Sequence, residues 1–259
     1  MTAIVLVGAA GRMGRAITEA LASADDLQLA TSVDRPEAIP AGAPRAWTSD
    51  LAAAVTPGAV VVEFSAPAVA ASVARLCADR GAALVSGTTG LDADAERVMR
   101  EASARIAVVR AANFSLGVLA LRRALEAALA ALPAGWDIEI VERHHRGKQD
   151  APSGTALMLG RQAAEQRGYA AESLRTGRAG RGLRPREEVG IHSLRGGTWI
   201  GDHAVVLAGS GEWLELRHVA EDRAAFASGV LAAARFVAGA TPGLYTLDHV
   251  AGAMAGASG

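Results

Sequence analysis

The chain has 259 residues, of which 51% are apolar, and this is enough to bury a sizeable core in one large unit or two modest domains. Its 26 basic and 27 acidic side chains nearly cancel, so no global charge attracts it to nucleic acid or to an anionic membrane surface. No stretch approaches the roughly 18 consecutive apolar residues of a membrane span, and residues 1–7 show no signal-peptide pattern. We therefore expect a cytoplasmic protein, and the single cysteine, Cys77, agrees with a reducing compartment.

The first half of the chain alternates short β-branched runs with alanine-rich helical stretches, which is the pattern of parallel βαβ units. The runs that predict strands are residues 3–7, 29–33, 60–64, 83–86 and 106–110. The stretches that predict helices are residues 12–23, 68–80 and 92–105. Short connections between these elements favour a doubly wound parallel sheet.

The second half of the chain has a different pattern, with more strands and less helix. Its predicted helices are residues 116–132, 154–167 and 224–238, and its predicted strands are residues 136–143, 189–195, 202–208 and 212–219. Successive strands with little helix between them predict a mixed or antiparallel sheet. Residues 168–188 are polar and rich in arginine and glycine, which is typical of a long surface loop.

The change of pattern near Phe114 indicates an α/β protein of two domains. We expect residues 1–113 to form the domain with the parallel sheet, and residues 114–223 to form an α+β domain with the second sheet. Residues 224–259 are expected to pack back on the first domain.

Three glycines directly follow the first predicted strand, where the first helix begins. Gly8, Gly11 and Gly14 have the spacing G-x-x-G-x-x-G, which departs from G-x-G-x-x-G and alone would indicate only a tight turn. Such glycines let backbone amides approach a pyrophosphate at the helix N-terminus. Asp34 closes the second strand 20 residues after Gly14, where a carboxylate can accept hydrogen bonds from an adenosine ribose. Together they predict a Rossmann-type dinucleotide-binding domain.

Neighbouring residues bear on the choice of cofactor. Arg35 can pair with a 2′-phosphate, so NADH and NADPH both stay open, although an ordinary solvated side chain is an equally good interpretation. Residues 86–90 and 111–114 follow the fourth and fifth strands and should reach the same carboxyl edge of the sheet. We expect the nicotinamide end of the cofactor there, although threonine–glycine runs are also common turns.

The most informative stretch runs from Glu142 to Thr155 and places two imidazoles and an ammonium just before a predicted helix. Hydride delivery to an electron-poor carbon builds negative charge on its conjugated partner, and a nearby proton donor must quench that charge. His144 and Lys148 can do this. The stretch therefore predicts reduction of a small anionic substrate.

The helix that follows begins with donors suited to a carboxylate. Pro152 has the fixed φ of a first turn, and Ser153 or Asp150 can cap the helix. The amides of Gly154 and Thr155, together with the Thr155 hydroxyl, would then face the substrate.

The histidine pair has other interpretations. If the strand continued through His145, His144 and His145 would point to opposite faces, so they are not expected to share one role. A basic surface loop whose histidines only hydrogen-bond is the commoner explanation of a bare His-His pair. A metal site is not expected, because no third ligand with recognisable spacing follows and Lys148 would repel a cation.

The segment from Glu139 to Ala156, EIVERHHRGKQDAPSGTA, closely resembles the signature of the 4-hydroxy-tetrahydrodipicolinate reductase family, formerly called dihydrodipicolinate reductases, of bacterial lysine and diaminopimelate biosynthesis. The likeness spans nearly the whole chain. Further motifs in family order are GAAGRMG at 8–14, GTTG at 87–90, AANFS at 111–115, IHSLRGG at 191–197, GDH at 201–203 and GLY at 243–245.

The resemblance implies a role for each matching residue. His144 is implied as the proton donor or acceptor and Lys148 as the second proton donor. The groups implied to hold the carboxylates of the dicarboxylate substrate are His145, Gly154 and Thr155. The implied contacts to NADH or NADPH are Gly8, Ala9, Ala10, Gly11, Arg12, Met13, Asp34, Arg35, Gly87, Thr88, Thr89, Ala111, Ala112, Asn113 and Phe114. The resemblance also implies a homotetramer assembled through the second domain's sheet.

The chain departs from the family pattern in three places. Glu63 stands where an aspartate is more usual, the surroundings of Arg223 differ, and Asp34 replaces the glutamate of some relatives. Two other functions stay open: a dinucleotide-sensing regulatory protein, and another NAD(P)-dependent dehydrogenase of an amino-acid pathway. An acylating aldehyde dehydrogenase is disfavoured, because Cys77 in a helix is badly placed as a nucleophile.

Overall fold

The structure is a computed structural model that describes residues 1–43 and 46–256. The chain divides into two compact units, Met1–Leu116 together with the chain from Arg223 onward, and Gly117–Asp222. The sequence pattern places these boundaries after residues 113 and 223. No helix within the described ranges is long and apolar enough to span a lipid bilayer.

Among the described residues, the first unit is built on a seven-stranded sheet in the order β12-β6-β5-β4-β1-β2-β3, with every adjacent pair parallel. Its strands are β1 (Thr2–Val7), β2 (Leu27–Val33), β3 (Trp47–Thr48), β4 (Val60–Glu63), β5 (Ala83–Ser86), β6 (Ala107–Arg110) and β12 (Gly243–Tyr245). Its helices are α1 (Arg12–Ala22), α2 (Leu51–Ala54), α3 (Pro67–Arg80), α4 (Ala93–Ser103), α7 (Ala224–Gly239) and α8 (Leu247–Gly256), with the short 3-10 helix η1 (Pro36–Ala38). The chain runs outward from β1 to β3 and then resumes on the other side at β4. This reversal confirms the predicted doubly wound parallel sheet.

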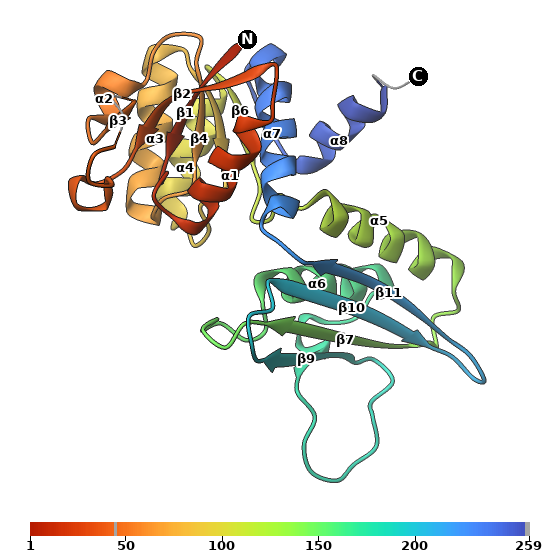
Figure 1. Cartoon of the computed structure of the whole chain (residues 1–259). Coiled ribbons are helices and arrows are strands. Elements are labelled where there is room, and N and C mark those ends of the chain that lie inside the picture. Colours follow the sequence, from red (N-terminus) through yellow and green to blue (C-terminus); the bar gives the residue numbers. More distant parts are fainter. Residues whose placement is uncertain (44–45, 257–259) are drawn as a thin grey trace. The chain divides into compact units, whose positions relative to one another are not determined.

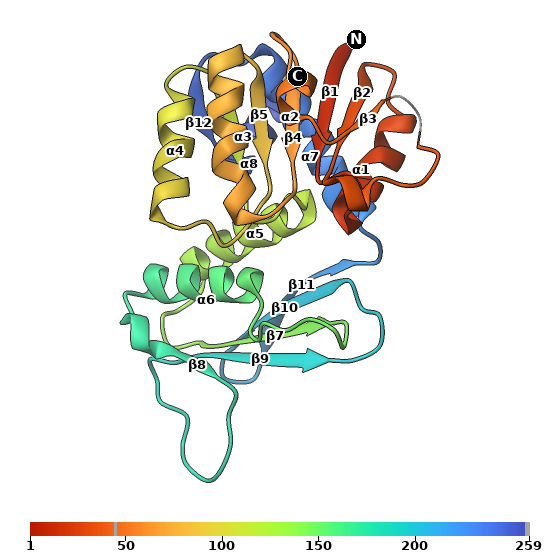
Figure 2. The same cartoon turned by 90° about the vertical axis from the view of Figure 1, so that its left-hand side faces the viewer.

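Helices cover both faces of this sheet (Figure 2). α3 and α4 pack together on one face, while α7 packs on α1 and on β4, β5 and β6. The central strand is buried on both sides, since Ile4, Val5 and Leu6 are at most 2% exposed. Parallel strands covered on both faces need such continuous apolar runs, which is why they were predictable from the sequence.

The shortest elements of this unit have no periodic signal in the sequence. β3 and α2 lie in the connection between β2 and β4, and β12 extends the sheet beside β6. Strands of two or three residues are too short to show alternation, and the four-residue helix α2 is too short to show a helical period. They were therefore absent from the predicted elements.

The second unit contains a five-stranded sheet in the order β11-β10-β7-β9-β8. β11, β10, β7 and β9 are labelled in Figure 1, and β8 is labelled beside β9 in Figure 2. Its strands are β7 (Asp137–His144), β8 (Leu174–Thr176), β9 (Val189–Arg195), β10 (Gly201–Ala208) and β11 (Trp213–Ala220). Its helices are α5 (Leu116–Ala131), which begins at the unit boundary, and α6 (Gly154–Arg167), with the short 3-10 helix η2 (Ala171–Ser173). β10 is antiparallel to β7 and β11, whereas β7, β9 and β8 are parallel. This confirms the predicted second sheet of mixed strands.

β7 shows how the sequence places this sheet on its core. Its residues alternate between half-buried and buried, and Ile138 and Ile140 have no exposed surface. They pack with α5, α6, β9 and β10 in one apolar core. Residues 168–188, which were expected to resemble a long surface loop, also contain the three-residue strand β8, of which only Leu174 packs against this core.

Candidate active site

The inner face of β7 changes from apolar to polar along its length. After two isoleucines, the next buried positions are Glu142, with no exposed surface, and His144, at 8% exposure. The strand ends at His144, so His145 belongs to the following loop, where its amide donates to the carbonyl of Trp199 at 2.8 Å. The two-residue period of the strand thus brings a carboxylate and an imidazole to the same face of the sheet.

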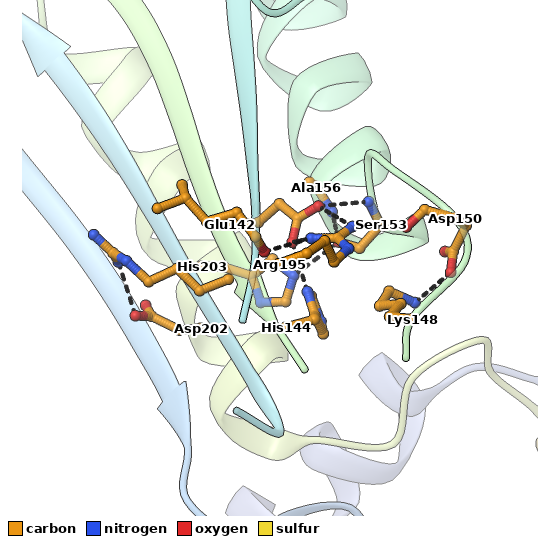
Figure 3. A network of polar contacts seen from close by, with 11 residues as sticks. Glu142, His144, Lys148, Asp150, Ser153, Ala156, Arg195, Asp202 and His203 are labelled. Carbon is orange, nitrogen blue, oxygen red and sulfur yellow. Dashed lines mark hydrogen bonds and ion pairs between the residues drawn. The ribbon is translucent and has the colours of Figure 1, made fainter. Parts of the chain in front are cut away.

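Glu142 is the centre of the network drawn in Figure 3. Its Oε2 lies 2.5 Å from His144 Nδ1 and 2.8 Å from Arg195 Nη1. Its Oε1 accepts from Arg195 Nη2 at 2.7 Å and from the backbone N–H of Ser153 at 3.1 Å. Burial alone would raise the pKa of Glu142, but the hydrogen bonds from His144 and Arg195 outweigh burial and hold that pKa well below its usual range. Glu142 is therefore an ionised carboxylate at neutral pH.

Lys148 is connected to this network through Asp150. The Lys148 ammonium lies 2.7 Å from Asp150 Oδ1, and this hydrogen bond lowers the pKa of the Asp150 carboxyl. The Asp150 carbonyl in turn accepts from Arg195 Nη2 at 2.6 Å. Lys148 is also the only lysine in the chain, because the other 25 residues of the basic set are arginines.

The start of α6 lies beside the same carboxylate. Ser153 is the N-cap, and its Oγ accepts from the amide of Ala156 at 3.2 Å. Pro152 therefore precedes the cap, and the prediction that it occupies the first helical turn was wrong. Gly154 and Thr155 are the first two helical residues, whose amides are directed out of the helix N-terminus.

His203 on β10 supports this arrangement from the other side. Its Nε2 lies 3.0 Å from Ser153 Oγ, and its ring is edge-on to the His144 ring with centroids 5.1 Å apart. Burial, together with the neighbouring His144, lowers the pKa of His203 to about 4. At neutral pH His203 is therefore an uncharged side chain that fills the space beside His144.

The arginine next to His144 lies on the opposite face of the strand. Arg143 donates to Asp202 Oδ2 at 2.8 Å, and Arg217 donates to both oxygens of Asp202 at 2.7 and 3.0 Å. This carboxylate and its two arginines form a separate ion-pair group. The cation of Arg143 is thus directed away from Glu142 and His144.

In the first unit, the turn between β1 and α1 leaves no room for side chains at two glycines. Gly8 has a φ of 83°, and a Cβ there would lie 2.2 Å from the carbonyl oxygen of Phe64. A Cβ at Gly14 would lie 2.4 Å from the carbonyl oxygens of both Gly8 and Ala9. Gly11 caps α1 without a side-chain hydrogen bond, so the amides of its first turn suit an anionic group.

Asp34 lies against this turn. Its Oδ2 accepts from the amide of Ala10 at 2.9 Å and its Oδ1 accepts from the amide of Arg35 at 2.9 Å. The side chain of Arg35 is exposed and lies 3.4 Å from a carboxylate oxygen of Glu37. The acidic residue predicted to meet a ribose is thus adjacent to the glycines predicted to meet a pyrophosphate.

A second buried glutamate organises the neighbouring loops. Glu63 has no exposed surface and ends β4. Its carboxylate accepts from Ser65 Oγ at 2.6 Å, from Ser86 Oγ at 2.8 Å and from Thr88 Oγ1 at 2.5 Å. The amide of Ser65 donates to the same carboxylate at 2.7 Å. Glu63 therefore ties the loop after β4 to the loop after β5.

The predicted cofactor contacts gather at the carboxyl edge of the parallel sheet, because each segment follows the end of a strand. These segments are residues 8–13 after β1, 34–35 after β2, 87–89 after β5 and 111–114 after β6. The amide of Ala111 donates to the carbonyl of Ser86 at 3.3 Å, and the rings of Phe64 and Phe114 lie 5.6 Å apart. The loops after β4, β5 and β6 thus contact one another directly.

Several residues of these networks were not predicted from the sequence. Glu142 carries the one available signal, since it stands two residues before His144 on a predicted strand and must share its face. Arg195 lies 53 positions from Glu142, and His203 lies 50 positions from Ser153. Only the pairing of their strands with β7 brings Arg195 and His203 close to these partners. Glu63 was noted as a departure from the family pattern, but its hydrogen bonds could not be inferred.

The carboxyl edge of the first unit's sheet fits a nicotinamide dinucleotide. Within residues 1–43 and 46–256, no group of three or more His, Cys, Asp or Glu side chains could hold a metal ion. The glycine turn without a capping side chain, the adjacent Asp34 and the doubly wound sheet match the requirements of a bound pyrophosphate and ribose. Fold and site together define a Rossmann-type oxidoreductase with a second α+β unit.

Comparisons with known proteins identify the family. The family model described as dihydrodipicolinate reductase, N-terminus, matches residues 2–114, and the model described as its C-terminus matches residues 117–251. The chain belongs to the dihydrodipicolinate reductase family. It is therefore an oxidoreductase that uses NADH or NADPH to reduce 4-hydroxy-tetrahydrodipicolinate in lysine and diaminopimelate biosynthesis.

Individual relatives agree over nearly their whole length. A 4-hydroxy-tetrahydrodipicolinate reductase of Thermomicrobium roseum is 47% identical, with 96% of this chain and 99% of the relative covered. One of Nitrosomonas eutropha is 41% identical, with 96% and 97% covered. The solved structure of a dipicolinate-bound dihydrodipicolinate reductase from Paenisporosarcina sp. TG-14 has a TM-score of 0.77 at 24% identity, with 95% and 97% covered. That structure supports the fold.

Replacing Glu63 tests its role in ordering the loops that are predicted to contact the cofactor. Glu63→Gln puts an amide N–H₂ against side-chain and backbone donors, and an unsatisfied buried donor costs about 1–3 kcal/mol. We expect the Kd for NADPH to rise by roughly tenfold to a hundredfold, measured by calorimetry. Glu101→Gln, an exposed carboxylate on α4, is the control. An unchanged Kd in Glu63→Gln would contradict the role.

The buried His203 predicts a pH dependence of stability. Its pKa of about 4 lies below the ordinary 6.5, so between these values the unfolded chain binds a proton that the folded chain does not. Stability therefore falls as the pH drops through this window, by roughly 2 kcal/mol between about pH 7 and pH 5. His203→Gln should remove that part of the slope in urea unfolding, whereas His249→Gln, at an exposed position, should not. Equal slopes in His203→Gln and the parent protein would refute the assignment.

Proposed function

We propose that this reductase holds its cyclic dicarboxylate at the end of β7, where His144 and Lys148 supply and accept protons. His145, Gly154 and Thr155 hold the carboxylates. The observation that carries this proposal is one continuous set of contacts that links His144 to Glu142, Arg195, Asp150 and Lys148. The start of α6 joins the same set through the Ser153 amide.

The dinucleotide would be held at the carboxyl edge of the first unit's sheet. The residues proposed to contact it are Gly8, Ala9, Ala10, Gly11, Arg12, Met13, Asp34, Arg35, Gly87, Thr88, Thr89, Ala111, Ala112, Asn113 and Phe114. When bound, the reduced nicotinamide supplies a hydride. In this proposal, residues 1–113 with 224–259 form the dinucleotide-binding domain, and residues 114–223 form the domain that holds the substrate and assembles the oligomer.

The chain's own residues then manage charge and protons. A substrate with two carboxylates is attracted by the Lys148 ammonium and by the partial positive charge at the start of α6. Loss of water from the 4-hydroxyl position and arrival of a hydride leave negative charge on the conjugated ring. A proton from His144 or Lys148 neutralises that charge and completes the reduction. The local cations in an otherwise balanced chain are explained by this substrate.

We also propose that the protein is cytoplasmic. The cytoplasm supplies NADH and NADPH, and the only cysteine, Cys77, is free and buried, as suits a reducing compartment. Immunodetection after cell fractionation is the test of this location.

A homotetramer is proposed for the assembled enzyme, built through the outer face of the second unit's sheet. α5 and α6 pack on the inner face, and large apolar side chains are exposed on the outer one. Trp213 is 64% exposed, Val219 48% and Leu194 40%. Exposed apolar residues gathered on one sheet face are typical of an interaction surface.

Trp213 provides the test of this assembly. Trp213→Glu places a charge where an interface would bury an aromatic ring, so we expect light scattering to show dimers or monomers in place of tetramers. Val69→Glu, on an exposed apolar position of α3 in the first unit, should leave the mass unchanged. A monomeric parent protein, or a Trp213→Glu variant that stays tetrameric, would contradict the proposed interface.

Lys148 provides the test of the proton chemistry. Lys148→Ala should lower kcat by at least about a hundredfold with cofactor binding retained, followed by nicotinamide absorbance with freshly made substrate. Lys148→Arg keeps a cation but removes a readily transferred proton, so it should recover substrate affinity better than turnover. Arg161→Ala, an exposed cation on α6, is the control. Turnover of Lys148→Ala near that of the parent protein would remove Lys148 from the mechanism.

A further inference from the structure

The carboxylate of Glu142 has a donor on every side. Each of its two oxygens accepts two hydrogen bonds: Oε2 from His144 and Arg195, and Oε1 from Arg195 and the Ser153 amide. A guanidinium and a backbone N–H can only donate. The network is therefore complete only if Glu142 is ionised and acts as an acceptor at all four positions.

This completeness fixes the tautomer of His144. An ionised carboxylate has no proton to give, so the 2.5 Å contact between Glu142 Oε2 and His144 Nδ1 requires that Nδ1 carries the hydrogen. In the neutral ring, Nε2 is then the unprotonated nitrogen. A proton can be gained or released by His144 only at Nε2.

The surroundings of Nε2 leave it usable for this exchange. Gly201 lies beside it, and a Cβ at that position would come within 3.3 Å of Nε2, so the glycine keeps this nitrogen uncrowded. The charged and titratable groups around the ring are Glu142 on the same strand, Arg195 on β9 and His203 on β10. Lys148, in the loop that follows β7, is connected to these groups through Asp150, which contacts both Lys148 and Arg195.

We infer that Glu142 is a positioning residue that directs proton transfer to Nε2 of His144, and that Arg195 keeps Glu142 ionised for this purpose. The inference rests on the proposed catalytic role of His144 and adds two residues to it. Neither Glu142 nor Arg195 needs to touch the substrate. Both act through the ring that does.

Glu142→Gln gives the sharpest test, because it should reverse the tautomer. The amide oxygen of glutamine would take the Oε1 position, where it accepts from Arg195 Nη2 and the Ser153 amide, while Arg195 Nη1 keeps the Leu194 carbonyl as its acceptor. Its N–H₂ would then face His144 Nδ1 and donate to it, so the ring hydrogen would move to Nε2. The readout is the ¹⁵N spectrum of histidine-labelled protein at about pH 9, where the ring is neutral in an ordinary histidine. The His144 signals are assigned by their loss in His144→Gln.

The expected kinetic result is a fall in kcat on the order of 10²- to 10⁴-fold in Glu142→Gln, with the Kd for dipicolinate changed less than tenfold. Glu142→Asp keeps an acceptor-only group and should retain the Nδ1–H tautomer and recover part of the turnover. Glu139→Gln is the matched control, since Glu139 lies on the other face of β7 and also pairs with an arginine and a histidine, Arg184 and His192. It should leave the His144 signals and kcat unchanged.

The outcomes separate this inference from the proposed function. An Nε2–H tautomer in the parent protein, or an Nδ1–H tautomer with full turnover in Glu142→Gln, would overturn the role of Glu142. Full turnover in His144→Gln would instead remove His144 from the chemistry. A reversed tautomer together with the loss of kcat in Glu142→Gln supports the inference, and the parent spectrum tests it even if a variant fails to fold.

Discussion

A buried negative charge is the constraint on which the second unit's site depends. An ionised carboxylate without exposed surface is costly unless donors surround it, and Glu142 is surrounded by donors from β7, β9 and the start of α6. Removing one partner of such a group typically costs about 3–5 kcal/mol. The position of the α6 N-terminus, the pairing of β7 with β9 and the orientation of the His144 ring are therefore linked by one group.

The first unit also contains a buried glutamate that accepts several hydrogen bonds, but there it lies among the loops at the carboxyl edge of the parallel sheet. Glu63, the last residue of β4, is fully buried like Glu142 and accepts hydrogen bonds from the side chains of Ser65, Ser86 and Thr88. In both units a strand carries a buried glutamate at or near its carboxyl end, and neighbouring segments donate hydrogen bonds to its carboxylate. His144 contacts Glu142 directly, and the lone lysine, Lys148, is linked to it through Asp150 and Arg195.

The sequence predicted those features that rest on local patterns. The apolar runs of β1 and β4, the glycine turn before α1 and the alternation in β7 are each visible within a few residues, and all were found. The edge strand β8 was missed because three residues show no period, and Pro152 was misplaced because two capping residues were available. Arg195 could not be predicted for another reason: it lies 53 residues after Glu142, and their contact depends on the parallel pairing of β7 with β9.

The proposed binding site for the dicarboxylate lies where His144, Lys148 and the start of α6 meet the end of β7. A crystal structure of the chain with oxidised nicotinamide dinucleotide and dipicolinate tests it most directly. We expect one carboxylate on the amides of Gly154 and Thr155, with the ring beside His144 Nε2. Dipicolinate bound instead on the outer face of the sheet, at Arg143 and Arg217, would contradict it.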